Sequence, residues 1–134
     1  MSTACGSPLY MAPEVILNKD YNEKADVFSI GVMAWQLITG GYPWDVKTKD
    51  ELKMKVKNRE PEFDAFKNIF NGVSKDCHDF LSKALIKDFN QRPSAGELLN
   101  HKWITDNKAK YEINKIRPDR AETGNILSHV KQFA

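Results

Sequence analysis

The sequence has little cysteine, no long apolar run and almost no excess of charge of either sign. Cys5 and Cys77 are the only cysteines among 134 residues. Two thiols so far apart predict neither a disulfide framework nor a metal site. We expect a reducing setting, the cytoplasm, with the nucleus as the alternative. No apolar run approaches the roughly 18 residues that a membrane-spanning helix needs, so no membrane partner is expected. The first residues lack the pattern of a secretory signal.

Basic and acidic residues are nearly balanced. The chain has 20 basic and 18 acidic residues, which gives a formal net charge of +2 and argues against a dedicated nucleic-acid-binding protein. Basic residues between positions 47 and 59 alternate with acidic ones, a pattern typical of a solvated helix face. His78, His101 and His129 have no metal-ligand spacing, so no metal site is expected.

One stretch is apolar on all sides of a helix. Ten of the fourteen residues from 25 to 38 are apolar, and this pattern predicts a helix inside the protein. Asn22 is expected to cap its start, and Gly40 to end it in a left-handed conformation. Asp26 lies in the first turn, where we expect hydrogen bonds to meet its carboxylate. Favourable interaction with the helix dipole is the alternative interpretation.

Local signals predict the remaining helices, and no segment has strand-like alternation. The expected starts are Pro13 for a short helix through residue 17, a Thr48–Glu51 capping box for a helix to about residue 58, a Ser74 cap, and a Ser94–Glu97 capping box. The stretch 63–70 is expected to form a loop or a short turn. The predicted fold class is all-α, with five or six helices.

The C-terminal residues have a different composition. Residues 105–122 are polar and charged, which is typical of a connecting segment. A helix is predicted from residue 123, with an apolar face formed by Ile126, Leu127, Val130 and Phe133. Core packing and docking to another module are both possible roles, and the position after a polar connector favours docking.

Four motifs resemble those of protein kinases. The stretch from Gly6 to Glu14, which contains Ala-Pro-Glu, resembles the end of the activation segment. Residues 26–32 resemble the start of the buried central helix of the large lobe. Residues 91–95 and 101–104 resemble the late arginine motif and the motif near the end of the domain. Because the motifs follow the family's order, residues 1–104 are identified as the C-terminal portion of a kinase domain, a helical fragment of the large lobe.

The resemblance implies roles for individual residues. Glu14 and Arg92 are implied to form a buried ion pair that supports the active site; the alternative is two unrelated surface charges. Asp26 is implied to accept hydrogen bonds from the backbone of the catalytic loop.

A substrate-docking floor is implied for Ser7, Leu9, Tyr10 and Met11, with the hydroxyl of Ser7 facing the catalytic aspartate and favouring Ser/Thr substrates. The alternative interpretation is a flexible loop with turn residues. Protein substrates and the remainder of the kinase domain are the implied partners.

Residues 125–133 are similar to the start of the junction helix in calcium-dependent protein kinases. In that family this helix inhibits the kinase, and an EF-hand module in the same chain releases it when calcium binds. The resemblance therefore implies autoinhibition through the face of Ile126, Leu127, Val130 and Phe133, with Ca²⁺ bound by an EF-hand module in cis. The wider calmodulin-dependent kinase group is the alternative.

Motifs for the chemistry itself are absent from the sequence as given. It contains no G-x-G-x-x-G loop, no H-R-D and no D-F-G, the motifs that hold ATP and Mg²⁺ and carry the catalytic aspartate. We therefore expect no catalytic residue in this chain and no bound cofactor, with ATP and Mg²⁺ implied for the full-length kinase. The competing interpretations are a truncated lobe that acts as a protein-binding module, and a piece of a longer chain with an artificial or mispredicted start.

Overall fold

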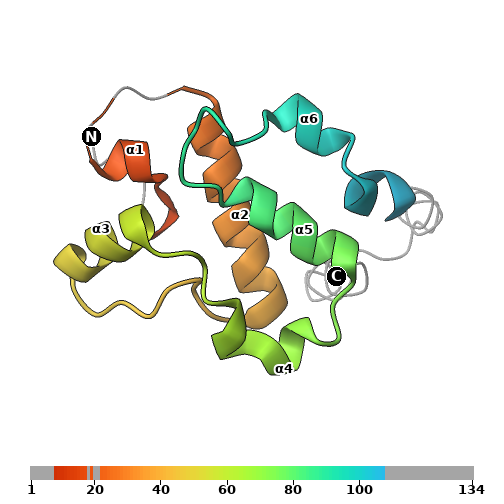
Figure 1. The fold of residues 1–134 in the computed structure, drawn as a ribbon, viewed down its shortest axis with the longest axis horizontal. Coiled ribbons are helices and arrows are strands. Elements are labelled where there is room, and N and C mark those ends of the chain that lie inside the picture. The colour runs from red at the N-terminus through yellow and green to blue at the C-terminus, as the bar shows by residue number, and fades with distance from the viewer. Residues whose placement is uncertain (1–7, 18, 20–21, 108–134) are drawn as a thin grey trace, which may run out of the picture.

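The computed structural model describes residues 8–17, 19 and 22–107. Within these residues there are helices and no strands, so the predicted all-α class is confirmed (Figure 1). The elements in chain order are η1 (Pro8–Tyr10), α1 (Pro13–Ile16), α2 (Lys24–Thr39), α3 (Lys49–Asn58), η2 (Phe63–Phe66), α4 (Lys67–Phe70), α5 (Lys75–Ala84) and α6 (Ala95–Leu99). Residues 102–107 are also helical.

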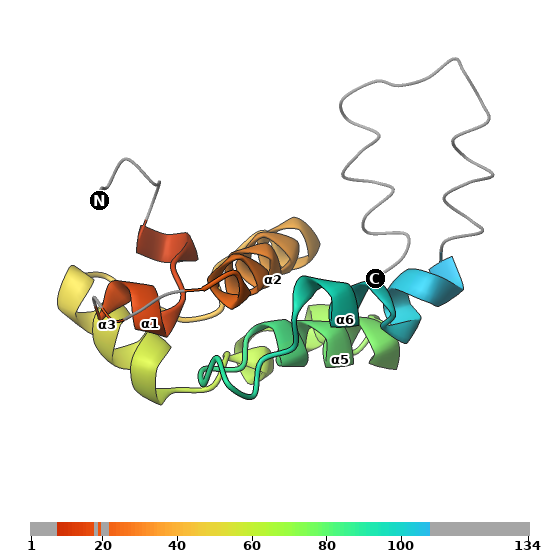
Figure 2. The same cartoon turned by 90° about the horizontal axis from the view of Figure 1, so that it is seen from above.

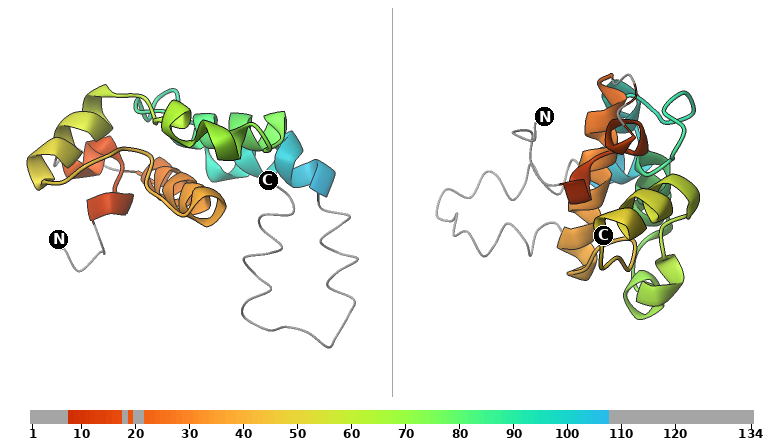
Figure 3. Two further views of the ribbon diagram at one scale, coloured as in Figure 1. Left: turned by 90° about the horizontal axis from the view of Figure 1, so that it is seen from below. Right: turned by 90° about the vertical axis from the view of Figure 1, so that its left-hand side faces the viewer.

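The long helix α2 is the centre of the arrangement. It lies between α1 and α3 on one side and α5 and α6 on the other, as Figure 2 and the left panel of Figure 3 show. Contact with α5 is close because α2 has a glycine there: a Cβ on Gly31 would lie 2.9 Å from Cβ of Ala84 and 3.0 Å from Cδ2 of Leu85. Gly31 thus allows the two helices to approach.

Both ends of α2 follow the predicted signals, with a shift of one residue at the start. The side chain of Asn22 accepts a hydrogen bond from the backbone N–H of Lys24 at 2.8 Å, although Glu23 occupies the N-cap position. At the other end Gly40 has φ 80°, and its N–H donates to the carbonyl of Gln36 at 2.8 Å. This left-handed residue ends the helix, as predicted.

The predicted caps are present, and one of them differs in detail. The hydroxyls of Thr48, Ser74 and Ser94 each accept a backbone N–H three residues on, at 3.1 Å. Ser94 and Glu97 complete a capping box. Glu51 instead accepts from the N–H of Lys47 at 3.1 Å, so the second half of that predicted box reaches one residue further back.

Residues 63–70 form two short helical turns, η2 and α4, where a loop or turn was expected. Their aromatic side chains pack on one central ring. The centroid of Trp35 lies 4.8 Å from Phe63, 5.6 Å from Phe66 and 4.9 Å from Phe70. The helical turns bring these three rings into contact with one indole. Residues 63–70 are too few for hydrophobic periodicity to predict helical turns.

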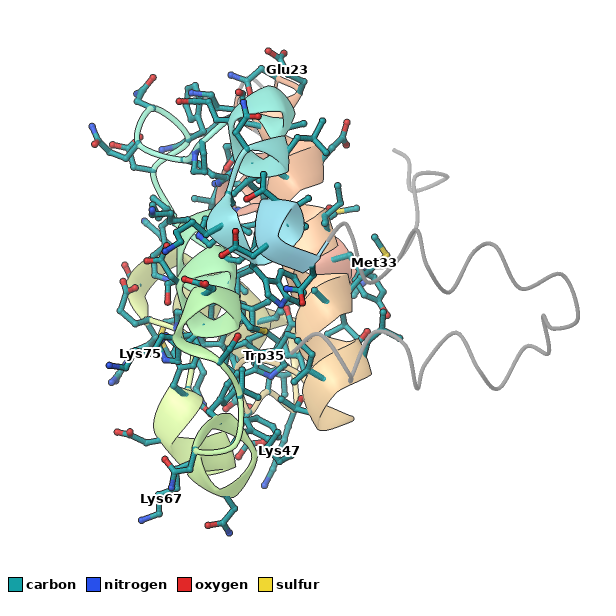
Figure 4. The ribbon with its side chains drawn as sticks, turned by 90° about the vertical axis from the view of Figure 1, so that its right-hand side faces the viewer. Glu23, Met33, Trp35, Lys47, Lys67 and Lys75 are labelled. Atoms are coloured by element: carbon teal, nitrogen blue, oxygen red, sulfur yellow. The ribbon has the colours of Figure 1, made fainter. Side chains whose placement is uncertain are left out.

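One face of α2 is not buried, so the expectation of an interior helix on all sides is wrong there. Ile30, Met33 and Leu37 are 44%, 47% and 41% exposed. In Figure 4, Met33 lies on the side of α2 away from α5, whereas Trp35 lies on the inner side. Within the described ranges these three side chains are therefore only partly covered. None of the described helices is long and apolar enough to span a bilayer.

Candidate functional site

The N-terminal loop is fastened to α2 through one tyrosine. The hydroxyl of Tyr10 donates to Oε1 of Gln36 at 2.5 Å, and the hydroxyl of Ser29 donates to the backbone carbonyl of Tyr10 at 2.6 Å. The N–H of Met11 closes the η1 turn on the carbonyl of Pro8 at 3.2 Å. The loop is therefore held at both the side chain and the backbone of Tyr10.

Three of the four implied substrate-docking residues lie on this loop. Leu9, Tyr10 and Met11 are partly exposed, and Leu9 and Tyr10 also pack against the core. Ser7 lies outside the described residues. The loop thus combines a fixed backbone with apolar side chains at the surface, an arrangement that suits contact with an extended peptide.

A buried ion pair anchors the end of the same segment. Nη1 of Arg92 lies 2.8 Å from Oε2 of Glu14, and Nη2 lies 3.0 Å from Oε1. Arg92 is 1% exposed and Glu14 is 5% exposed. The two-point contact matches the planar guanidinium to the carboxylate, a geometry that lysine cannot reproduce.

The other N–H groups of Arg92 bind backbone carbonyls. Nε donates to Ile86 at 2.7 Å, Nη1 to Lys24 at 2.9 Å, and Nη2 to Lys87 at 3.0 Å. A guanidinium has five N–H groups, and with Glu14 all five are used. Arg92 therefore joins α1, the start of α2 and the loop after α5 at one buried point.

The carboxylate of Asp26 fits the alternative of a first-turn residue favoured by the helix dipole, and the catalytic loop implied as its partner is absent from the sequence as given. It lies in the first turn of α2 and is exposed, and its side chain has no partner among the described residues. Because it faces solvent near the N-terminus of a helix, the charge remains hydrated and is favoured by the dipole.

Two supporting residues were missed by sequence reasoning, namely Ser29 and Gln36. A signal for them was present, because Asp26, Ser29 and Gln36 interrupt an otherwise apolar helix at spacings of three and seven. These spacings place polar groups on one side of α2, and the loop around Tyr10 lies against two of them. The implied regulatory face of Ile126, Leu127, Val130 and Phe133 lies outside the described residues.

Burial lowers the pKa of Lys87, a lysine that contacts α3. Nζ of Lys87 donates to the carbonyl of Val56 at 3.0 Å and lies 4.9 Å from the ring centroid of Trp44. Desolvation lowers the pKa of Lys87 to about 8, against a smaller opposing effect of Glu60. The residues from 8–17, 19 and 22–107 contain no group of three or more side chains suited to a metal ion.

Comparison with known proteins agrees with this geometry. The family model of the protein kinase domain matches residues 1–104. A putative serine/threonine-protein kinase of Acanthamoeba polyphaga mimivirus, R517/R518, is 38% identical over 139 residues, covering 98% of this chain and 30% of the viral protein. Calcium/calmodulin-dependent protein kinase type 1 of Macrobrachium nipponense is 36% identical over 112 residues, covering 84% of this chain and 32% of that kinase.

A solved structure extends the likeness to three dimensions. The crystal structure of Rad53 1-466 in complex with AMP-PNP matches with a TM-score of 0.65 and 33% identity, covering 75% of this chain and 26% of that one. The described helices therefore form part of a protein kinase domain. The chain belongs to the protein kinase family, its relatives are Ser/Thr kinases, and it spans about a third of the two curated relatives above.

Proposed function

We propose that this chain is the C-terminal part of the large lobe of a calcium-dependent Ser/Thr protein kinase. The full-length enzyme would transfer the γ-phosphate of ATP to a serine or threonine of a protein substrate. In this proposal residues 1–104 belong to the kinase domain, 105–122 connect, and 123–134 begin the junction helix. The kinase part of the proposal is carried by the match of residues 1–104 to the protein kinase domain, together with a loop that Tyr10 fastens to α2 and that Glu14 anchors on Arg92.

The residues of this chain position the substrate and perform no chemistry. Leu9, Tyr10 and Met11, with Ser7, form the floor for the substrate segment. Ser29 and Gln36 hold Tyr10 of this floor on α2, and orientation of the reactants is a large part of phosphoryl transfer. Mg-ATP supplies the phosphoryl group when bound in the full-length kinase. The sequence as given lacks the motifs that would hold it, so this chain alone is proposed to be inactive.

The remainder of the kinase domain is the proposed partner of the uncovered face of α2. Ile30, Met33 and Leu37 expose apolar surface there. Asp26 adds an exposed carboxylate on the same side of the helix, with no partner among the residues that the structure describes. Such a face can bind a loop that packs on the apolar side chains and donates backbone N–H hydrogen bonds to the carboxylate. This assigns to Asp26 the role of supporting the catalytic loop.

Calcium regulation is the finer part of the proposal. The face of Ile126, Leu127, Val130 and Phe133 would inhibit the kinase until a calcium-loaded EF-hand module in the same chain binds it. Similarity to a calcium/calmodulin-dependent kinase supports this part. Calorimetry with calcium-loaded calmodulin as the probe tests it. We expect binding that Ile126→Asp abolishes and Ser128→Ala preserves, and absence of binding by the unaltered chain would overturn it.

A chimera tests the catalytic part of the proposal. Residues 1–104 would replace the matching segment of the Macrobrachium kinase, and incorporation of phosphate into a protein substrate would be measured. We expect serine or threonine phosphorylation that requires Arg92 and is indifferent to Lys67→Ala, a change at the exposed Lys67. A chimera that folds and binds ATP without transferring phosphate would contradict the proposal. The 134-residue chain alone should give no ATP binding in calorimetry.

A further inference from the structure

A cluster outside the substrate-docking loop joins α5 to helix 102–107. Nε2 of His101 lies 2.7 Å from Oδ2 of Asp79, and Nζ of Lys83 lies 3.0 Å from the same oxygen. On the other side of the ring, Nδ1 of His101 accepts a hydrogen bond from the backbone N–H of Trp103 at 3.1 Å. The side chain of His101 is 8% exposed. The rings of Phe80 and His101 pack edge to face, with their centroids 5.5 Å apart.

His101 is the cap of helix 102–107. Its backbone carbonyl accepts from the N–H groups of Ile104 and Thr105 at 2.9 and 3.0 Å, and its ring accepts from Trp103. The first N–H groups of a helix have no partner inside the helix, so a side-chain acceptor at this position stabilises its start. Here the acceptor is an imidazole nitrogen, which can be protonated.

The two ring contacts define the protonation state of the neutral ring. A nitrogen that accepts from an N–H carries a lone pair, so the proton of neutral His101 is on Nε2, where it donates to Asp79. A second proton would have to go to Nδ1. The resulting N–H would face the N–H of Trp103, and that hydrogen bond would be lost.

We propose that His101 is an acid-sensitive latch, in which protonation of Nδ1 removes the cap of helix 102–107 while Nε2 remains bound to Asp79. Residue 107 is the last one that the structure describes, and this helix is the element from which the chain continues. The latch lies apart from the substrate-docking loop and does not depend on the proposed kinase function.

Charged side chains from several neighbouring segments line the same cavity as His101. His101 lines a cavity of about 680 Å³ together with Lys24 from α2, Asp76, Asp79 and Lys83 from α5, Arg92 from the loop before α6, Glu97 from α6, and Lys102. Arg92 is bound by Glu14 and Glu97 by Ser94. Asp79 is the carboxylate in contact with the ring, at 2.7 Å from Nε2.

Asp79 keeps its charge while His101 is protonated. Hydrogen bonds from His101 and Lys83 hold the pKa of Asp79 below its usual range. An imidazolium is attracted to this carboxylate, so acid weakens the helix cap and spares the contact with α5.

The test is a pH titration of the 134-residue chain by NMR. Ring signals of His101 report its tautomer and protonation, and amide signals of residues 103–107 report the helix. We expect the Nε2–H tautomer at neutral pH. The amide chemical shifts of residues 103–107 should change with the same midpoint pH as the ring signals of His101. Hydrogen-exchange protection of the Trp103 amide, corrected for the intrinsic effect of pH, should fall about fivefold. His78, on α5, is the internal control, because its protonation should leave residues 103–107 unchanged.

Two variants separate the two contacts. His101→Asn places an amide oxygen near the position of Nδ1, so the cap should persist and lose its pH dependence. His101→Gln places an amide N–H near the position of Nε2, so the contact with Asp79 should persist without the cap at any pH. An Nδ1–H tautomer at neutral pH, static amides during titration of the His101 ring, or a wild-type response in His101→Asn would each overturn the proposal.

Discussion

Arg92 and Glu14 stand 78 positions apart in the sequence and share two hydrogen bonds of 2.8 and 3.0 Å in the interior. The pair is not isolated, since the remaining N–H groups of Arg92 bind three backbone carbonyls. A charge buried with every hydrogen-bonding group satisfied is stable, whereas the same charge without its partner is costly. This contact ties α1 and the loop before it to the helices that follow.

Removal of one member of this pair should destabilise the chain strongly. We expect Glu14→Gln and Arg92→Lys each to lower the free energy of unfolding by about 3–5 kcal/mol, because each leaves a buried charge without its two-point partner. Urea denaturation followed by circular dichroism measures the loss. Lys67→Ala, at an exposed site, is the control and should change stability by less than about 0.5 kcal/mol. A loss below about 1 kcal/mol in both variants would show that the pair is dispensable.

Local signals were sufficient for most helix ends. The caps at Thr48, Ser74 and Ser94 depend on a side chain and a backbone N–H three residues apart, so a short stretch of sequence contains the whole interaction. Gly40 is similar, because the left-handed conformation that it adopts is easier for glycine than for residues with a side chain. Contacts between distant residues carry no such local signal.

The long-range parts of the site were less accessible to pattern reasoning. The pairing of Arg92 with Glu14 came from resemblance to the kinase family, and the contact between His101 and Asp79 was not foreseen. The apolar residues on all sides of α2 predict burial, but this pattern does not identify the elements that pack against each side. Ile30 is 44% exposed because no described element packs on that side. The turns at 63–70 depend on the ring of Trp35, far away in sequence.

The contact between α2 and α5 should tolerate no side chain at position 31. Gly31→Ala would place a Cβ 2.9 Å from Cβ of Ala84, so the helices must separate. We expect a loss of about 1–3 kcal/mol in the free energy of unfolding, measured by denaturation. Gly96→Ala is the matched control, because a Cβ there meets nothing nearer than Oγ of Ser94 at 3.9 Å. That change should stabilise α6 by up to about 1 kcal/mol. Equal effects at both positions would refute the packing argument.

The hydroxyl of Ser29 should restrain the substrate-docking loop. Ser29→Ala removes the bond to the carbonyl of Tyr10, and we expect a loss of about 1 kcal/mol in stability together with faster hydrogen exchange at Met11. In the kinase chimera the KM for the protein substrate should rise while ATP binding is unchanged. Ser82→Ala is the control, since among the described residues the hydroxyl of Ser82 hydrogen-bonds to His78 of its own helix alone. If exchange at Met11 were the same in both variants, the restraint would not exist.

The lowered pKa of Lys87 should make stability rise with pH in the alkaline range. Lys87 has a pKa of about 8 in the folded chain against 10.5 as its ordinary value. Between these values the unfolded chain binds more protons, so the free energy of unfolding increases as pH rises from about 8 to 10.5. The buried thiol of Cys77 acts in the opposite direction, because burial raises its pKa from 9.0 to about 12 and stability falls above pH 9.

A comparison with Lys87→Met separates the two effects. The variant keeps an apolar side chain beside Trp44 and retains Cys77, so the thiol contributes equally to both proteins. We expect the stability difference between wild type and Lys87→Met to shift in favour of the wild type as pH rises from 7 to 10, in denaturation curves at each pH. A constant difference across this range would mean that Lys87 titrates alike in the folded and unfolded chains, and that its burial beside Trp44 does not disfavour the charge.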